Sequence, residues 1–275
     1  MSEHHLRYAA NCSMLFTERP LLERPRAAKE AGFDAIEFWW PWPDAPVPSD
    51  AEVTSFVEAV RDAGVRLVGL NFFAGDLAGP DCGVLSIPSR SSQFADNVAV
   101  TVGIGEQLDV PAFNALYGNR VEGVAAAAQD DLAREQLGLA ADAADRIGAT
   151  VLIESVSGPK PYPLRTAADS AAVVQALREA GHVNVGFLCD LFHLANNGDD
   201  PSAAVTTYAP LISHVQIADH PGRGEPGTGS LDLDGLLGQL VAEGYSGWVG
   251  LEYKPTTDTE GSLGWLPPSR RSSTR

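Results

Sequence analysis

The apolar residues of this chain fall into short, almost continuous runs that alternate with longer amphipathic segments. Continuous apolar runs of about 4–8 residues are typical of strands buried on both faces, whereas apolar residues recurring every three or four positions indicate helices. The pattern predicts eight strands, at residues 6–11, 33–39, 66–72, 112–116, 150–154, 185–190, 213–217 and 248–253. It predicts helices between them, most clearly at residues 51–63, 129–147, 166–180 and 233–243.

Residues at the ends of these segments support the predicted helices. Ser49 and Asp50 precede the helix at 51–63 and suit its N-cap, and Gly64 suits its C-terminal end. Pro25 lies inside the helical segment at 21–31, and proline is tolerated only in the first turn of a helix. We therefore expect that helix to begin near Arg24.

The alternation of strands and helices over the whole chain predicts a parallel α/β fold. A Rossmann-type sheet shares this alternation, but it carries Gly-x-Gly-x-x-Gly after its first strand, where this chain reads NCSMLF at 11–16. The 275 residues suffice for a TIM barrel, which needs about 250. We expect a single (β/α)8 TIM barrel over residues 1–268, without a domain linker, and a disordered tail over 269–275.

Four consecutive predicted strands end in a side chain that can bind a metal ion. Glu154, Asp190, Gln216 and Glu252 each close an apolar run, and they are spaced 26 to 36 residues apart, about the length of one βα unit. A buried carboxylate is costly unless it is paired or bound to a cation. In a barrel these side chains would converge at one end. The pattern predicts either a site for one Mg²⁺ or Mn²⁺, the ions that prefer oxygen ligands, or a pair of acid/base carboxylates that works without a cation.

Four further residues are candidates for substrate binding. His193 lies three residues beyond Asp190, and Glu37 ends the second predicted strand. Arg223 and Lys254 are the cations best placed to meet a substrate carboxylate. Three of them also have a purely structural interpretation: capping or packing for His193, an ion pair for Glu37, and a solvated loop charge for Arg223. The Gly/Pro/Ser-rich segment 75–92 and the segment 223–229 are the loops expected to cover the site.

Composition excludes several classes of partner. The net charge of −17 argues against binding to nucleic acid or to anionic membranes. No apolar stretch is long enough to span a membrane, and the N-terminus has no secretory signal. The three cysteines form no Cys-x-x-Cys motif, which argues against a disulfide framework or a zinc cluster. We expect a cytoplasmic protein that acts on a small anionic substrate, and the chain leaves open whether it forms a homo-oligomer.

Several segments together resemble the hydroxypyruvate isomerase family of xylose-isomerase-like barrels. The most specific are HVQIAD at 214–219, RGEPGTG at 223–229 and GWVGLEYKP at 247–255. Weaker matches are NCSMLF at 11–16, AGDL at 74–77, LIE at 152–154 and DLFH at 190–193. The resemblance implies that Glu154 and Glu252 form the acid/base pair, around a cation position that also involves Asp190 and Gln216. It implies interconversion of hydroxypyruvate and 2-hydroxy-3-oxopropanoate (tartronate semialdehyde) through an enediolate.

Two departures from the family pattern leave the substrate open. The family usually has Glu-Pro-Ile-Asn after its fifth strand, where this chain has ESVS at 154–157, and Leu70 replaces a usual histidine. A 2-oxo-tetronate isomerase, acting on a four-carbon acid, is therefore a competing interpretation. A ketose 3-epimerase would usually place a histidine at Gln216, and a DNA-repair endonuclease on this barrel would need more histidines and a basic groove. A non-catalytic sugar-acid binding protein would use the same groups as the enzyme.

Overall fold

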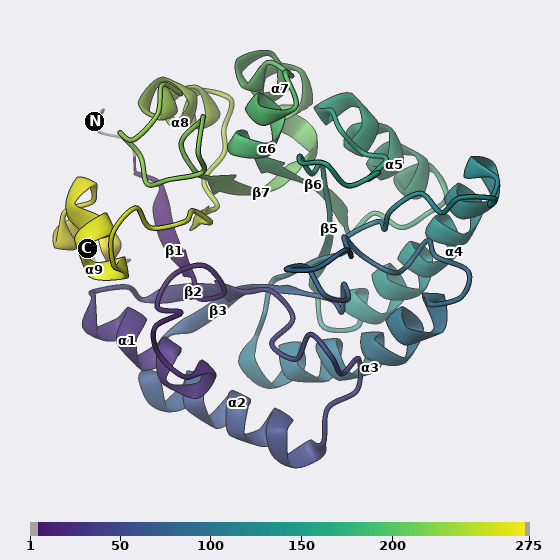
Figure 1. Ribbon diagram of the computed structural model, residues 1–275, viewed down its shortest axis with the longest axis horizontal. Helices are drawn as coiled ribbons and strands as arrows, with labels where there is room; N and C mark the ends of the chain where they lie inside the picture. The colour runs from purple at the N-terminus through teal and green to yellow at the C-terminus, as the bar shows by residue number, and fades with distance from the viewer. Residues whose placement is uncertain (1–4, 273–275) are drawn as a thin grey trace.

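The computed structural model describes residues 5–272, and it confirms the predicted TIM barrel. Its eight strands form a closed parallel barrel in which each strand pairs with the next in sequence and the eighth pairs with the first. The helices surround the barrel as an outer ring (Figure 1). The closed ring excludes the open Rossmann-type sheet.

The strands begin and end within two residues of the predicted positions. They are β1 (Arg7–Asn11), β2 (Ala35–Phe38), β3 (Arg66–Asn71), β4 (Ala112–Asn114), β5 (Thr150–Glu154), β6 (Val185–Asp190), β7 (Ile212–Ile217) and β8 (Trp248–Leu251). The larger helices are α1 (Arg24–Glu30), α2 (Asp50–Ala63), α3 (Ser91–Leu108), α4 (Ala126–Asp145), α5 (Ala167–Glu179), α7 (Pro201–Tyr208) and α8 (Leu233–Ala242). The shorter helices are α6 (Leu191–Asn196), α9 (Thr259–Ser262) and α10 (Pro268–Arg271).

Local sequence explains where the helices begin and end. Ser49 caps α2 in a capping box with Glu52, and Gly64 ends the helix in the left-handed conformation at φ 66°. Thr166 and Asp169 form a second capping box at the start of α5. The side chains of these caps accept hydrogen bonds from backbone N–H groups that have no partner inside the helix.

Two apolar regions hold the barrel together. The larger lies between the strands and the outer helices, and the smaller consists of two small clusters inside the barrel. At one end of the interior lie Ala9, Ala35, Val68 and Trp248, which belong to the first halves of their strands or to strand starts. The interior at the carboxyl ends of the strands is polar instead, and this is the end at which TIM barrels carry their active sites.

The first residues of the tail that we expected to be disordered are helical in the structure. Pro268–Arg271 forms α10, and the Arg271 guanidinium donates hydrogen bonds to the backbone oxygens of Ala31, Leu263 and Leu266. One arginine thereby ties the C-terminal segment to the end of α1, which the composition of the tail does not reveal. Residues 273–275 lie outside the described part of the chain. Within residues 5–272, no helix combines the length and apolarity needed to cross a bilayer.

Candidate active site

A polar side chain marks the carboxyl end of every strand of the barrel. Each of these residues is buried, with no more than 6% of its surface exposed. Seven are the last residues of β1 to β7 or lie one position from the end, and the eighth directly follows β8: Asn11, Glu37, Asn71, Asn114, Glu154, Asp190, Gln216 and Glu252. So many buried polar groups at one end of an apolar barrel require partners or a ligand.

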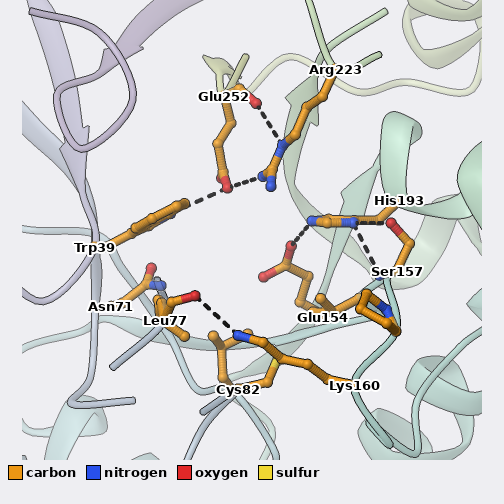
Figure 2. A pocket seen from close by; sticks show the side chains of 13 residues that line it. Trp39, Asn71, Leu77, Cys82, Glu154, Ser157, Lys160, His193, Arg223 and Glu252 are labelled. Atoms are coloured by element: carbon orange, nitrogen blue, oxygen red, sulfur yellow. Dashed lines mark hydrogen bonds and ion pairs between the residues drawn. The ribbon is translucent and has the colours of Figure 1, made fainter. Parts of the chain in front are cut away.

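A cavity of about 140 Å³ opens at this end of the barrel. The two glutamates of the predicted acid/base pair, Glu154 and Glu252, both line it, together with His193 and Arg223 (Figure 2). Ligand pockets for drug-sized molecules occupy about 300–1,000 Å³, so this cavity suits a smaller compound. The structure thus brings two residues that are far apart in the sequence to one small cavity.

Glu252 is held by two donors on one side of the cavity. Its Oε1 accepts hydrogen bonds from Arg223 Nη2 at 2.6 Å and from Trp39 Nε1 at 3.2 Å. Burial raises the pKa of Glu252, and the charge of Arg223 opposes that shift. Arg223 itself is aligned by the face of Phe192, whose ring centre lies 5.5 Å from the guanidinium carbon. These contacts fix the carboxylate at the edge of the cavity.

Glu154 lies on the opposite side and has a different environment. Asn114 Nδ2 donates to its Oε2 at 2.6 Å, and among residues 5–272 no positively charged group forms an ion pair with it unless His193 is protonated. Burial, and next the nearby charge of Asp190, raise the pKa of Glu154 to about 8. The two glutamates therefore differ in their partners, as expected for groups that exchange a proton with the two ends of one substrate.

The hydrogen bonds of His193 determine which of its ring nitrogens carries the proton. The backbone N–H of Ser157 donates to Nδ1 at 3.0 Å, so Nδ1 has no proton and the neutral ring carries it on Nε2. Burial keeps the ring neutral by lowering its pKa. Nε2 lies 3.8 Å from both Glu154 Oε1 and Asp190 Oδ2. His193 thus presents an N–H donor toward the cavity, which suits contact with a substrate oxygen better than contact with a metal ion.

The oxygen atoms around Asp190 suit a hard divalent cation. Asp190, Glu154 and His193 offer ligand atoms that lie within 4.8 Å of one another. Asp190 Oδ2 and Gln216 Oε1 are buried and accept no hydrogen bond from the described residues, and Asp190 and Gln216 are neighbours across β6 and β7. Because His193 presents a donor, the ligands available are oxygens, and this donor set fits Mg²⁺ or Mn²⁺.

Glu37 lies beneath this site and fixes the orientation of Gln216. Its Oε1 accepts hydrogen bonds from Gln216 Nε2 at 2.8 Å and Asn11 Nδ2 at 3.0 Å, and its Oε2 pairs with His214 Nε2 at 2.7 Å. Because the amide nitrogen of Gln216 faces Glu37, its carbonyl oxygen must face the other way, toward the cation position. Glu37 does not line the cavity of Glu154 and Glu252, so the structure gives it a supporting position instead of the expected substrate contact.

We expect Glu37→Gln to weaken the binding of divalent cations. A glutamine at this position has no charge and one acceptor oxygen where Glu37 has two, so it holds the amide of Gln216 less firmly and keeps all three contacts only if His214 accepts a hydrogen bond. The buried mismatch should also lower the free energy of unfolding by about 1–3 kcal/mol. Titration calorimetry with Mn²⁺ and denaturant unfolding measure the two effects. Glu58→Gln, on the exposed face of α2, is the matched control, and equal Mn²⁺ affinity in both variants would show that Glu37 has no such role.

The structure places the remaining candidates differently from the sequence-based expectation. The side chain of Lys254 is exposed and does not line the cavity, because its backbone N–H donates to Arg223 O and the chain turns away there. Several lining or supporting residues were not predicted as site residues, among them Trp39, Asn114 and Lys160. Asn114 is the last residue of β4, but the predicted strand continued through Ala115 and Leu116, so the sequence did not mark Asn114 as a strand end.

Comparison with known proteins identifies the family. Residues 25–269 match the xylose isomerase-like TIM barrel family. A *Streptomyces coelicolor* protein provisionally named hydroxypyruvate isomerase is 53% identical over 97% of this chain and 98% of its own. The chain belongs to the hydroxypyruvate isomerase family. The *Escherichia coli* hydroxypyruvate isomerase is 31% identical over 96% of this chain and all of its own length.

Two further relatives correspond to alternatives considered in the sequence analysis, a 2-oxo-tetronate isomerase and a DNA-repair endonuclease. The 2-oxo-tetronate isomerase of *Pectobacterium atrosepticum* is 31% identical over 95% of this chain and 97% of its own. A crystal structure described as an AP endonuclease of family 2 from *Brucella melitensis* is 32% identical, with a TM-score of 0.85, and covers 96% of this chain and 98% of that one. Among residues 5–272 of this chain, the group able to hold a metal ion contains a single histidine, which does not resemble a multi-zinc nuclease centre.

Proposed function

We propose that this protein is an isomerase that interconverts hydroxypyruvate and 2-hydroxy-3-oxopropanoate by moving a proton between neighbouring carbons. The observation that carries the proposal is the position of Glu154 and Glu252 on opposite sides of one small buried cavity. The hydroxypyruvate isomerases among its relatives support this choice of substrate.

In the proposed reaction, one glutamate removes a proton from C3 of hydroxypyruvate, and an enediolate forms between C2 and C3. The other glutamate delivers a proton to C2, while the hydroxyl proton moves from O3 to O2, so the product has the same atoms as the substrate. Because the reaction is reversible, each glutamate is the base in one direction. The Nε2–H of His193 donates to a substrate oxygen in this arrangement.

Glu154, Asp190, Gln216 and Glu252 are the residues that would hold a divalent cation. When bound, Mg²⁺ or Mn²⁺ would stabilise the negative charge that develops on the two substrate oxygens. Asn114 and Arg223 keep Glu154 and Glu252 in place through the hydrogen bonds described above. Glu37 keeps the carbonyl oxygen of Gln216 directed toward the same position.

A second candidate is the isomerisation of 2-oxo-tetronate, a four-carbon acid, which the *Pectobacterium* relative supports. Both reactions need the same two glutamates and a substrate carboxylate, and they differ in one hydroxymethylene group. We also propose that the protein acts in the cytoplasm. Its three cysteines are all free and buried, in keeping with a reducing compartment.

NMR spectroscopy in D₂O tests the proposal directly. With Mg²⁺ or Mn²⁺ present, we expect deuterium at C2 of the product from hydroxypyruvate, at a rate far above that of the enzyme-free solution. The same measurement on 2-oxo-tetronate decides between the three- and four-carbon substrates. Tight binding of either acid without any solvent exchange would instead indicate a binding protein.

A further inference from the structure

The cavity contains a lysine that no family motif or strand-end pattern indicates. Lys160 lies in the loop that follows β5, is half-buried, and lines the cavity next to Leu77 and Cys82 (Figure 2). Its Nζ donates to the backbone oxygens of Leu77 at 3.0 Å and Asp81 at 2.5 Å. An ammonium group has three donors, so one N–H remains for a ligand.

The partners of Lys160 leave its positive charge available. Both are neutral carbonyl groups, and within the described residues Lys160 forms no ion pair with a carboxylate. Arg223, the other cation that lines the cavity, is already paired with Glu252 at 2.6 Å. Lys254, which the sequence suggested for this task, is exposed outside the cavity. Among the described residues that line the cavity, Lys160 is therefore the cation that has no ion-pair partner.

The rest of the cavity is unfavourable for a substrate carboxylate. Glu154 and Glu252 form two of its sides, and Asp190 lies just below Glu154. A carboxylate placed among these acids would be repelled at short range, where the low dielectric of the interior strengthens the interaction. The reacting carbons must nevertheless lie between the two glutamates. The carboxylate end of an oxo-acid is thus expected to point toward Lys160.

We propose that Lys160 binds the carboxylate of the substrate and makes the enzyme selective for short oxo-acids over neutral ketoses of the same length. This inference rests on the proposed isomerase function, because it takes the reacting carbons to lie between Glu154 and Glu252. It assigns Lys160 the role that the sequence suggested for Arg223 and Lys254. The charge-assisted hydrogen bond would form with the N–H that the two carbonyl groups leave free.

The hydrogen bonds of Lys160 also connect two loops at the cavity, the one after β5 and the one after β3. Leu77 and Asp81 belong to the long connection between β3 and α3, which is braced by an ion pair between Asp81 and Arg90 at 2.7 Å. Lys160 thus joins this connection to the loop after β5, and a bound carboxylate would add a third partner at the same point. Recognition of the anion and coverage of the cavity then depend on one side chain.

Binding of D-glycerate tests the assignment without requiring turnover. This three-carbon hydroxy acid keeps the carboxylate but lacks the carbonyl group needed for enolisation. We expect Lys160→Met to raise its Kd about 10- to 100-fold in titration calorimetry, whereas Lys160→Arg stays within a few-fold of the unaltered protein. Lys254→Met should leave the Kd unchanged. Thermal unfolding of each variant shows whether the fold is intact.

Turnover of a neutral analogue separates recognition of charge from general damage to the site. Dihydroxyacetone replaces the carboxylate of hydroxypyruvate with a hydroxymethyl group. Lys160→Met should lower kcat/KM for hydroxypyruvate while solvent exchange into dihydroxyacetone, measured at high concentration, stays the same. An unchanged Kd for D-glycerate in Lys160→Met, or an equal loss in Lys254→Met, overturns the proposal. If the unaltered protein binds D-glycerate through Lys160 yet never turns over hydroxypyruvate, the isomerase function fails and the anion site stands.

Discussion

Replacing either glutamate of the pair with glutamine should reduce turnover of hydroxypyruvate by about 10²- to 10⁴-fold, the usual contribution of a positioned acid or base. Glutamine keeps the shape of the side chain and the capacity to accept hydrogen bonds, but it cannot exchange a proton. Glu154→Gln and Glu252→Gln should therefore fold normally and bind D-glycerate, so the loss should appear in kcat. Steady-state assays of both directions measure it.

The same two variants can show which glutamate acts first. In D₂O, the variant that retains the base for hydroxypyruvate should still exchange hydrogen at C3 of recovered substrate while forming no product. The other variant should show neither exchange nor product. Glu58→Gln, on the surface of α2, serves as the control and should match the unaltered enzyme. Near-normal turnover in either cavity variant would remove that residue from the mechanism.

The convergence of these glutamates could be predicted because strand geometry is regular. The apolar runs predict strands, parallel strands align their carboxyl ends, and the polar residues at those ends must then meet. This reasoning placed Glu154 and Glu252 correctly at one cavity and Asp190 beside Gln216. It did not identify Asn114, which ends β4 and donates to Glu154, because the apolar residues Ala115 and Leu116 follow it and extend the predicted strand.

The depth of a side chain was harder to predict than its direction. Glu37 points into the barrel, as its strand position indicates, but it lies under the cavity and not beside the substrate. The reason is a gap left by two glycines, Gly69 on β3 and Gly250 on β8. A Cβ atom on Gly250 would come within 2.3 Å of Glu37 Oε1, and one on Gly69 within 3.3 Å of its Cβ. Only the register of three strands together shows that this space exists.

Loop residues were predicted least well because no periodic pattern governs their direction. Lys254 follows Glu252 by two positions, but the hydrogen bond from its backbone to Arg223 turns the chain so that its side chain is exposed. Lys160 reaches the cavity through contacts with Leu77 and Asp81, which are 83 and 79 residues away in the sequence. Its place depends on two loops packing together, and a single sequence does not reveal that.

The second large effect expected is a stabilisation by divalent cations that grows with pH. Without a cation, burial raises the pKa of Glu154 from 4.5 to about 8 and that of Asp190 from 3.8 to about 6. Between the ordinary and the raised pKa the folded state binds more protons than the unfolded state, so these groups lower the free energy of unfolding as pH rises through that window. Mg²⁺ or Mn²⁺ bound to the carboxylates removes this penalty.

We therefore expect one fixed Mn²⁺ concentration, 100 times the Kd at pH 8, to raise Tm by about 5 °C at pH 8, and by clearly less at pH 5, where protons compete for the same oxygens and raise the Kd. Differential scanning calorimetry at matched ionic strength, with and without EDTA, measures both shifts. In Glu154→Gln the dependence on pH should shrink, because a carboxylate whose pKa burial raises to about 8 is gone. A Tm shift that is the same at both pH values, or absent at both, would mean that these oxygens do not bind the cation together.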